Sequence, residues 1–145
     1  MSTVKDLMTK SVITIDVNKT IFDAAELMSN KEIGDLIIER KYMPIGIVTE
    51  RDFVRRFIAK KLPLDTKISE IMSKPLITID SYASIKEAAR TMIKHKIRRL
   101  PVLEKKKLVG IIVATDFAHH IGKKSITEEI LKAIGRYTFP HVFER

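Results

Sequence analysis

The chain repeats itself at a fixed interval. Shifting the sequence by 64 residues aligns positions 4–53 with positions 68–117 without a gap, and 17 of the 50 aligned pairs are identical. The phrases "DLMTKSVITID" and "EIMSKPLITID" correspond, as do "GIVTERDF" and "GIIVATDF". A gapless repeat of this length indicates two copies of one supersecondary unit. We therefore expect copies at 1–64 and 65–121, followed by a C-terminal segment at 122–145 that has no counterpart.

Each copy is predicted to have the order β-α-β-β-α. A short β-rich run, "VITI" or "LITI", comes first. Thr20 and Ser84 are then expected to cap helices whose apolar residues recur at helical spacing, with Ser84 and Glu87 forming a capping box. Two further β-rich runs follow, and a second helix is expected to open at Asp52 and at Asp116. The predicted fold class is α/β (α+β), with two such units and a short C-terminal helix.

The composition excludes several kinds of site. The 145 residues include no cysteine, so disulfides, thiolate catalysis and cysteine-ligated metals are ruled out. No apolar run approaches the roughly 18 residues needed to cross a membrane. The opening "MSTVKDLMTK" lacks the apolar stretch of a signal peptide. We therefore expect a cytoplasmic protein that has no membrane partner.

The sequence offers no pattern for catalysis or metal binding. It contains no phosphate-binding glycine loop, no HExxH and no G-x-S-x-G elbow. His119 and His120 are adjacent on a predicted helix, where neighbouring side chains project about 100° apart and make a poor metal pair. We expect neither an enzyme nor a metal site.

The net charge of +9 is concentrated in the second half of the chain. Residues 1–67 carry 12 Lys and Arg against 10 Asp and Glu, whereas residues 68–145 carry 15 against 8. A basic excess is compatible with nucleic-acid binding, but Lys-rich runs also occur in solvated turns. Aromatic residues are few and are not interleaved with the basic ones. Nucleic-acid binding therefore stays a less favoured alternative, beside a purely structural dimerisation module.

The second copy, "IMSKPLITIDSYASIKEAARTMIKHKIRRLPVLEKKKLVGIIVATDF", closely resembles a CBS domain, named for cystathionine β-synthase, and the first copy resembles another. The resemblance covers about residues 4–121. It implies a tandem pair, or Bateman module, that binds an adenosine-containing ligand and regulates other proteins. It also implies that the copies pack by pseudo-twofold symmetry, leave two clefts between them, and associate as a homodimer.

The resemblance implies that each cleft combines the early segment of one copy with the late segment of the other. The main cleft is expected to hold a nucleotide with Thr9, Lys10, Val12, Ile13, Thr14, Ile97, Arg98, Arg99, Thr115 and Asp116. The second, weaker cleft is expected to use Ser73, Lys74, Leu76, Ile77, Thr78, Gly34, Thr49, Arg51 and Asp52. The aspartate in each set is expected to accept both ribose hydroxyls, since a carboxylate can accept two hydrogen bonds from a cis-diol.

The two clefts are not expected to be equivalent. The main cleft has the arginines at 98 and 99 where the first copy has Gly34 and Asp35, so phosphate should prefer it. Position 113 is Val, however, where the first copy has Thr49. Each aspartate also has a simpler interpretation, because Asp at a helix start stabilises the helix without any ligand. The expected ligand is AMP, ADP or ATP, or S-adenosylmethionine, and the sequence does not identify the regulated protein.

Overall fold

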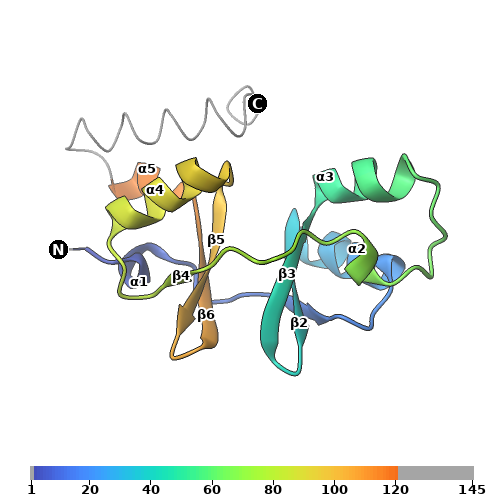
Figure 1. Ribbon diagram of the computed structural model, residues 1–145, viewed down its shortest axis with the longest axis horizontal. Coiled ribbons are helices and arrows are strands. Elements are labelled where there is room, and N and C mark those ends of the chain that lie inside the picture. The colour runs from blue at the N-terminus through green and yellow to red at the C-terminus, as the bar shows by residue number, and fades with distance from the viewer. Residues whose placement is uncertain (1, 121–145) are drawn as a thin grey trace. The chain divides into compact units, whose positions relative to one another are not determined.

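The computed structural model describes residues 2–120, which form two compact units (Figure 1). Unit 2 consists of residues 13–77, and the described part of unit 1 consists of residues 2–12 together with 78–120. The chain therefore starts in unit 1, builds unit 2 and returns to unit 1. Each unit holds the main part of one sequence copy and takes its first segment from the other copy.

Unit 2 contains one three-stranded sheet. Its elements are β1 (Thr14–Asp16), α2 (Ile21–Lys31), β2 (Asp35–Arg40), β3 (Met43–Thr49), α3 (Glu50–Asp52), a π-helical continuation of α3 (Phe53–Ile58) and a 3-10 turn (Ile68–Glu70). The sheet order is β1-β2-β3, with β1 parallel and β3 antiparallel to β2. The register of β2 and β3 shifts between Ile38 and Glu39.

Unit 1 repeats this arrangement. Its described elements are α1 (Val4–Leu7), β4 (Ile79–Asp80), α4 (Ile85–His95), β5 (Arg99–Glu104), β6 (Lys107–Val113) and α5 (Asp116–His120). The sheet order is β4-β5-β6, with the same strand directions as in unit 2. Its register shift lies between Val102 and Leu103, 64 residues after the first one. The sequence repeat is thus a structural repeat, and both copies share even the register shift in the sheet.

The predicted helix starts agree with the structure at Thr20 and Ser84, which are the N-caps of α2 and α4. The Ser84 hydroxyl accepts a hydrogen bond from the Glu87 N–H at 3.0 Å. Complete reciprocal boxes are found instead at Thr20 and Asp23, at Thr3 and Asp6, and at Thr49 and Asp52. The second helix of unit 2 begins at Glu50, two residues before the predicted Asp52, because Thr49 is its N-cap. The strands β1 and β4 are shorter and begin later than predicted, and the short helix α1 was not predicted.

The core of each unit follows the helical spacing read from the sequence. Ile85, Ala88, Ala89 and Met92 form the buried face of α4. In unit 2 three consecutive residues of β2, Leu36 to Ile38, are almost fully buried, so both faces of this strand are covered. Burying a side chain of this size contributes roughly 1.5–3 kcal/mol, and this core holds the loops at the strand ends in place.

A glycine lets the early segment of the chain lie directly against β6. Thr9 and Ile111 exchange two backbone hydrogen bonds, of 2.8 and 3.0 Å. A Cβ atom on Gly110 would lie 2.5 Å from Met8 Sδ and 2.8 Å from the Thr9 carbonyl oxygen. This close approach explains why the phrase "GIIVATDF" opens on glycine.

In unit 2, a glycine likewise lets the first segment of the second copy, around Ser73, lie directly against β3. Ser73 and Ile47 exchange backbone hydrogen bonds of 2.8 and 3.3 Å. A Cβ atom on Gly46 would lie 2.6 Å from Met72 Sδ and 3.0 Å from the Ser73 carbonyl oxygen. In both copies, the glycine of the repeated phrase thus leaves room for the first segment of the other copy.

Candidate functional site

The carboxylate of Asp116 lies at the turn between β6 and α5. Its Oδ2 accepts a hydrogen bond from the Val113 N–H at 2.9 Å, which closes this turn. Asp116 is half-buried and Thr115, just before it, is exposed. Among the side chains that the structure describes, none is recorded as a partner of Asp116 Oδ1. The helix-start interpretation of Asp116 accounts for one carboxylate oxygen and leaves acceptor capacity for a ligand.

The two arginines of the main set lie beside this turn. Arg99 opens β5 and is paired with Val113 across the sheet, while the Arg98 carbonyl accepts a hydrogen bond from the Ala114 N–H at 2.8 Å. Both arginines are half-buried. The backbone thus brings the start of β5 and the end of β6 together at the position of Asp116.

Eight of the ten residues predicted for the main cleft lie in unit 1. Thr9 and Lys10 are exposed and Val12 is half-buried, on the early segment that pairs with β6. Ile97 is half-buried, and its N–H donates to the Met92 carbonyl at 3.0 Å. The other two residues of the set, Ile13 and Thr14, belong to unit 2.

The carboxylate of Asp52, the equivalent residue in unit 2, is engaged at both oxygens. Asp52 is only 8% exposed. Its Oδ2 accepts hydrogen bonds from the Thr49 N–H at 2.9 Å and from the Thr49 hydroxyl at 3.3 Å. Its Oδ1 lies 3.5 Å from Arg56 Nε. Asp52 therefore has less remaining capacity for a diol than Asp116 has.

The second predicted set is also gathered mainly in one unit. Eight of its nine residues lie in unit 2, and Thr78 lies in unit 1. Ser73 is held against β3 by its backbone bonds to Ile47, and the Gly34 carbonyl accepts from the Glu50 N–H at 3.1 Å. A Cβ atom on Gly34 would lie 2.9 Å from Glu50 Oε1. The Glu50 carboxylate thus lies beside Gly34, the position at which the other copy has Arg98.

Arg56 belongs to this site but was missed from the sequence. Besides its contact with Asp52, its Nη1 donates to the carbonyls of Ile71 and Met72 at 3.3 Å each. The available signal was the spacing of Asp52 and Arg56, because oppositely charged residues four apart on a helix face each other. The equivalent position in the second copy is His120.

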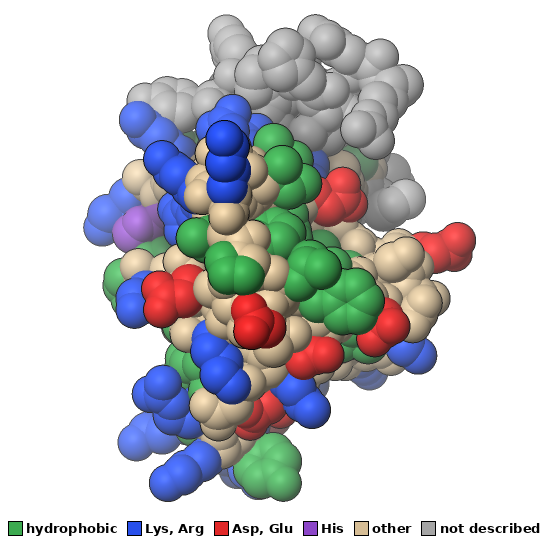
Figure 2. Space-filling view, turned by 90° about the vertical axis from the view of Figure 1, so that its right-hand side faces the viewer, with side chains coloured by type: hydrophobic (Ala, Val, Ile, Leu, Met, Phe, Trp, Pro, Cys, Tyr) green, Lys and Arg blue, Asp and Glu red, His purple; other side chains and the backbone are tan. Residues whose placement is uncertain are grey.

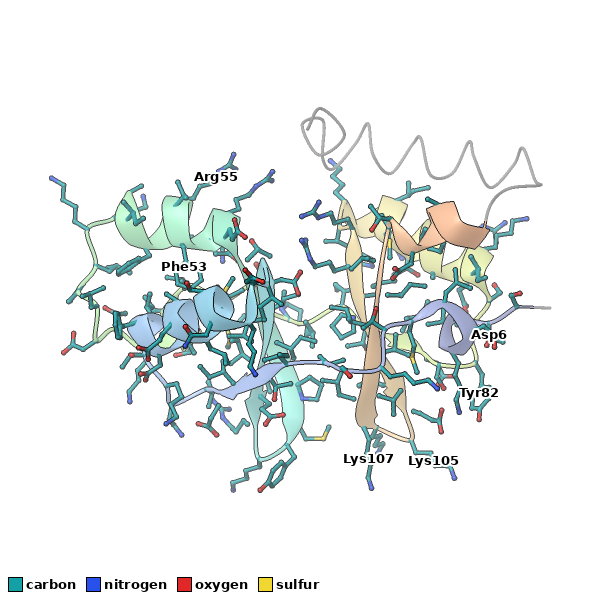
Figure 3. All side chains as sticks on the ribbon, turned by 180° about the vertical axis from the view of Figure 1, so that it is seen from behind. Asp6, Phe53, Arg55, Tyr82, Lys105 and Lys107 are labelled. Carbon is teal, nitrogen blue, oxygen red and sulfur yellow. The ribbon has the colours of Figure 1, made fainter. Side chains whose placement is uncertain are left out.

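Unit 1 fixes its early segment with an ion pair that unit 2 does not have at the matching positions. Lys5 Nζ lies 3.1 Å from Glu104 Oε1, and the buried Ser81 hydroxyl donates to the same oxygen at 2.8 Å. The Ser81 hydrogen bond and the nearby Lys5 lower the pKa of Glu104, and Glu104 raises the pKa of Lys5. Lys5 Nζ also lies 5.2 Å from the centre of the exposed Tyr82 ring, which Figure 3 shows next to α1. These contacts hold the segment that carries Thr9.

Residues 2–120 contain neither a cluster of metal ligands nor a membrane-spanning helix. No group of three or more His, Cys, Asp or Glu side chains in this range could hold a metal ion. None of the helices in this range is long and apolar enough to cross a membrane. The predicted C-terminal helix lies outside the described residues.

Comparison with known proteins agrees with the repeat and with the fold. The CBS domain model matches residues 4–59 and 68–123. The "CBS domain-containing protein YhcV" of Bacillus subtilis is 37% identical over 118 residues, which cover 81% of this chain and 84% of that protein.

Two solved structures are similar over most of the chain. Hypoxic Response Protein I, solved with two coordinated zinc ions, has a TM-score of 0.76 at 32% identity and covers 83% of this chain and 100% of its own. The CBS domain pair of protein MJ0100, in complex with 5′-methylthioadenosine and S-adenosyl-L-methionine, has a TM-score of 0.74 at 28% identity and covers 84% and 97%. The chain belongs to the CBS domain family and carries two CBS domains.

Proposed function

We propose that this chain is a cytoplasmic, non-catalytic regulatory module that binds an adenosine-containing ligand through the site around Asp116. The observation that carries the proposal is the juxtaposition of Asp116, the two arginines and the Thr9 segment at one end of the β5–β6 pair. The adenosine compounds bound by the MJ0100 domain pair support this ligand class. Candidate ligands are AMP, ADP, ATP and S-adenosylmethionine.

Different residues of the site would bind different parts of the ligand, according to their chemistry. Asp116 has an oxygen left for the ribose hydroxyls, and an ionised carboxylate forms strong hydrogen bonds with such donors. Arg98, Arg99 and Lys10 supply positive charge for phosphate or for the carboxylate of S-adenosylmethionine, because a guanidinium can bind two oxygens at once. The half-buried Val12 and Ile97 offer an apolar surface for the adenine ring.

Isothermal titration calorimetry tests this proposal. The purified chain is titrated with AMP, ADP, ATP, S-adenosylmethionine and 5′-methylthioadenosine, with guanosine monophosphate as the control for base identity. We expect saturable binding of at least one adenosine compound in the micromolar range, equivalent to about −8 kcal/mol. The absence of saturable heat with every adenosine compound, or equal affinity for the guanosine control, would contradict the proposal.

We also propose that the chain self-associates through the exposed apolar surface of unit 2. Phe22, Val54, Ile58 and Leu64 are between 48% and 63% exposed. Figure 2 views the molecule from the right-hand side of Figure 1, where α2 and α3 lie. It shows hydrophobic side chains gathered in the middle of this face. Exposed apolar patches of this kind are typical of protein–protein contacts.

Multi-angle light scattering tests the homodimer. The variant Val54→Lys/Ile58→Lys should be monomeric at concentrations where the unchanged chain is a dimer. The control Tyr42→Lys changes another exposed side chain, at the tip of the β2–β3 hairpin, and should leave the dimer intact. A monomeric unchanged chain, or a dimer that survives the double substitution, would refute the assignment of this surface.

A further inference from the structure

A stripe of three cations runs along the exposed face of α4. Lys86, Arg90 and Lys94 are spaced four residues apart and are all exposed, while the opposite face of the helix is buried in the core of unit 1. At 1.5 Å per residue, successive cations are separated by about 6 Å along the axis and the stripe extends over about 12 Å. We call these three residues the α4 stripe.

Within the described part of the chain, no ion pair neutralises the charge of the α4 stripe. Among residues 2–120, no ion pair is recorded for any of its three members, and Glu87 is the one carboxylate on α4. The described part of unit 1 carries eleven Lys and Arg against five Asp and Glu, whereas unit 2 carries eleven against ten. The stripe therefore lies in the basic unit of the chain.

The fold itself does not require these cations. The helix α2 has the same length as α4, begins after the same kind of cap and buries the same face. At the three equivalent positions it carries Phe22, Glu26 and Asn30, which are also exposed. Because one helix is stable without a basic stripe, the stripe on the other is available for a role in binding.

We propose that the α4 stripe binds the phosphate backbone of a double-stranded nucleic acid without regard to base sequence. A row of Lys and Arg side chains on a rigid helix matches a regular row of phosphates, and such contacts position a protein without reading bases. An anionic membrane fits less well, because the apolar face of α4 is buried and cannot enter a bilayer. A single strand also fits less well, since it is held by stacking on several exposed aromatic rings. The described part of unit 1 has Tyr82 and the buried Phe117 as its aromatic residues.

The hairpin between β5 and β6 supplies a matched control. Lys105, Lys106 and Lys107 are exposed at its tip, and Figure 3 shows two of them extending from it. In Figure 1 this tip lies at the other end of the strands from α4. Neutralising the hairpin lysines removes the same number of positive charges as neutralising the α4 stripe. Comparing the two variants therefore shows whether duplex binding depends on the position of the charges or only on the net charge of the chain.

Fluorescence anisotropy with a labelled 20-base-pair duplex of arbitrary sequence, at 50 and 200 mM salt, tests the proposal. Lys86→Gln/Arg90→Gln/Lys94→Gln should weaken binding by about tenfold or more at low salt and lower the slope of log K against log salt by about 2–3. Lys105→Gln/Lys106→Gln/Lys107→Gln should retain affinity within about threefold and keep the slope within about 1. Circular dichroism verifies that each variant is folded.

A second variant, in which cations are added to α2, tests the proposal even if the variant with a neutralised α4 stripe does not fold. Glu26→Arg/Asn30→Lys, which leaves Phe22 and the surface proposed for self-association unchanged, places two of the three cations on α2. This variant should tighten duplex binding and steepen its salt dependence. Equal losses in the two neutralised variants, no effect of the cations added to α2, or no duplex binding by the unchanged chain would overturn the proposal. Binding to phosphatidylserine vesicles but not to the duplex would also overturn it. Neutralising the stripe should leave adenosine-ligand binding unchanged, so the two proposals fail independently.

Discussion

Asp116 in unit 1 and Asp52 in unit 2 occupy equivalent positions of the repeat, but their surroundings differ. Asp52 accepts hydrogen bonds from Thr49 through Oδ2 and forms an ion pair with Arg56 through Oδ1. Asp116 accepts one recorded hydrogen bond, from the Val113 N–H. The same backbone thus holds one carboxylate that is committed to the protein and one that keeps acceptor capacity. A duplicated fold can therefore keep its architecture while equivalent carboxylates differ in the hydrogen-bonding capacity that they have left.

The exposed surfaces of the two copies diverge as well. Phe22 on α2 corresponds to Lys86 on α4, and Tyr42 at the β2–β3 turn corresponds to Lys106 at the β5–β6 turn. Most buried positions, in contrast, keep apolar residues in both copies, as Val48 and Ile112 do, whereas the buried Ser81 replaces Val17. The core thus preserves the fold in both copies, whereas the exposed side chains at these positions are aromatic in unit 2 and basic in unit 1.

The largest expected effect concerns the glycines that admit the exchanged segments. Gly110→Ala should lower the free energy of unfolding by about 1–3 kcal/mol, because the added methyl group meets Met8 and a backbone oxygen at short range. Gly46→Ala should cost less, since its nearest backbone oxygen is 3.0 Å away rather than 2.8 Å. Urea unfolding measured by circular dichroism gives both values. A neutral Gly110→Ala would show that the early segment is not held against β6.

A smaller effect is expected when the Asp52 carboxylate loses its charged partner. Arg56→Gln should lower the free energy of unfolding by about 0.5–1 kcal/mol, because the arginine side chain is 51% exposed and its ion pair is partly screened. Ligand affinity at the Asp116 site should not change. The same urea titration measures the stability, and a large loss of ligand affinity would show that unit 2 supplies the stronger site.

The smallest effect concerns the ion pair found only in unit 1. The lowered pKa of Glu104 means that its contribution to stability is complete above its ordinary value of 4.5 and is lost as pH falls through the folded value. The raised pKa of Lys5 means that its contribution is lost as pH rises above 10.5. Glu104→Gln should therefore flatten the loss of thermal stability at acid pH. Thermal melts at pH 3, 4, 5 and 7 compare the variant with the unchanged chain, and identical pH profiles would contradict this role.

Much of the fold could be predicted from the sequence because local rules decide it. The caps Thr20 and Ser84 and the apolar spacing of α4 were sufficient to place both long helices. The exchange of early segments between spatial units could not be derived from local patterns, because it depends on how Gly46 and Gly110 meet segments distant in the chain. The role of Arg56 was also missed, since its contacts with carbonyls of the exchanged segment exist only in the folded structure.

The most direct test of the difference between the units is calorimetry of Asp116→Asn and Asp52→Asn, side by side, with the tightest adenosine ligand. Asp116→Asn should weaken binding by about 10- to 100-fold, as expected when hydrogen bonds to a charged group are lost. Asp52→Asn should change affinity by less than about threefold. It should instead lower stability, because the buried Asp52 accepts hydrogen bonds from Thr49 and forms an ion pair with Arg56. Equal losses of affinity, or a larger loss for Asp52→Asn, would contradict the account.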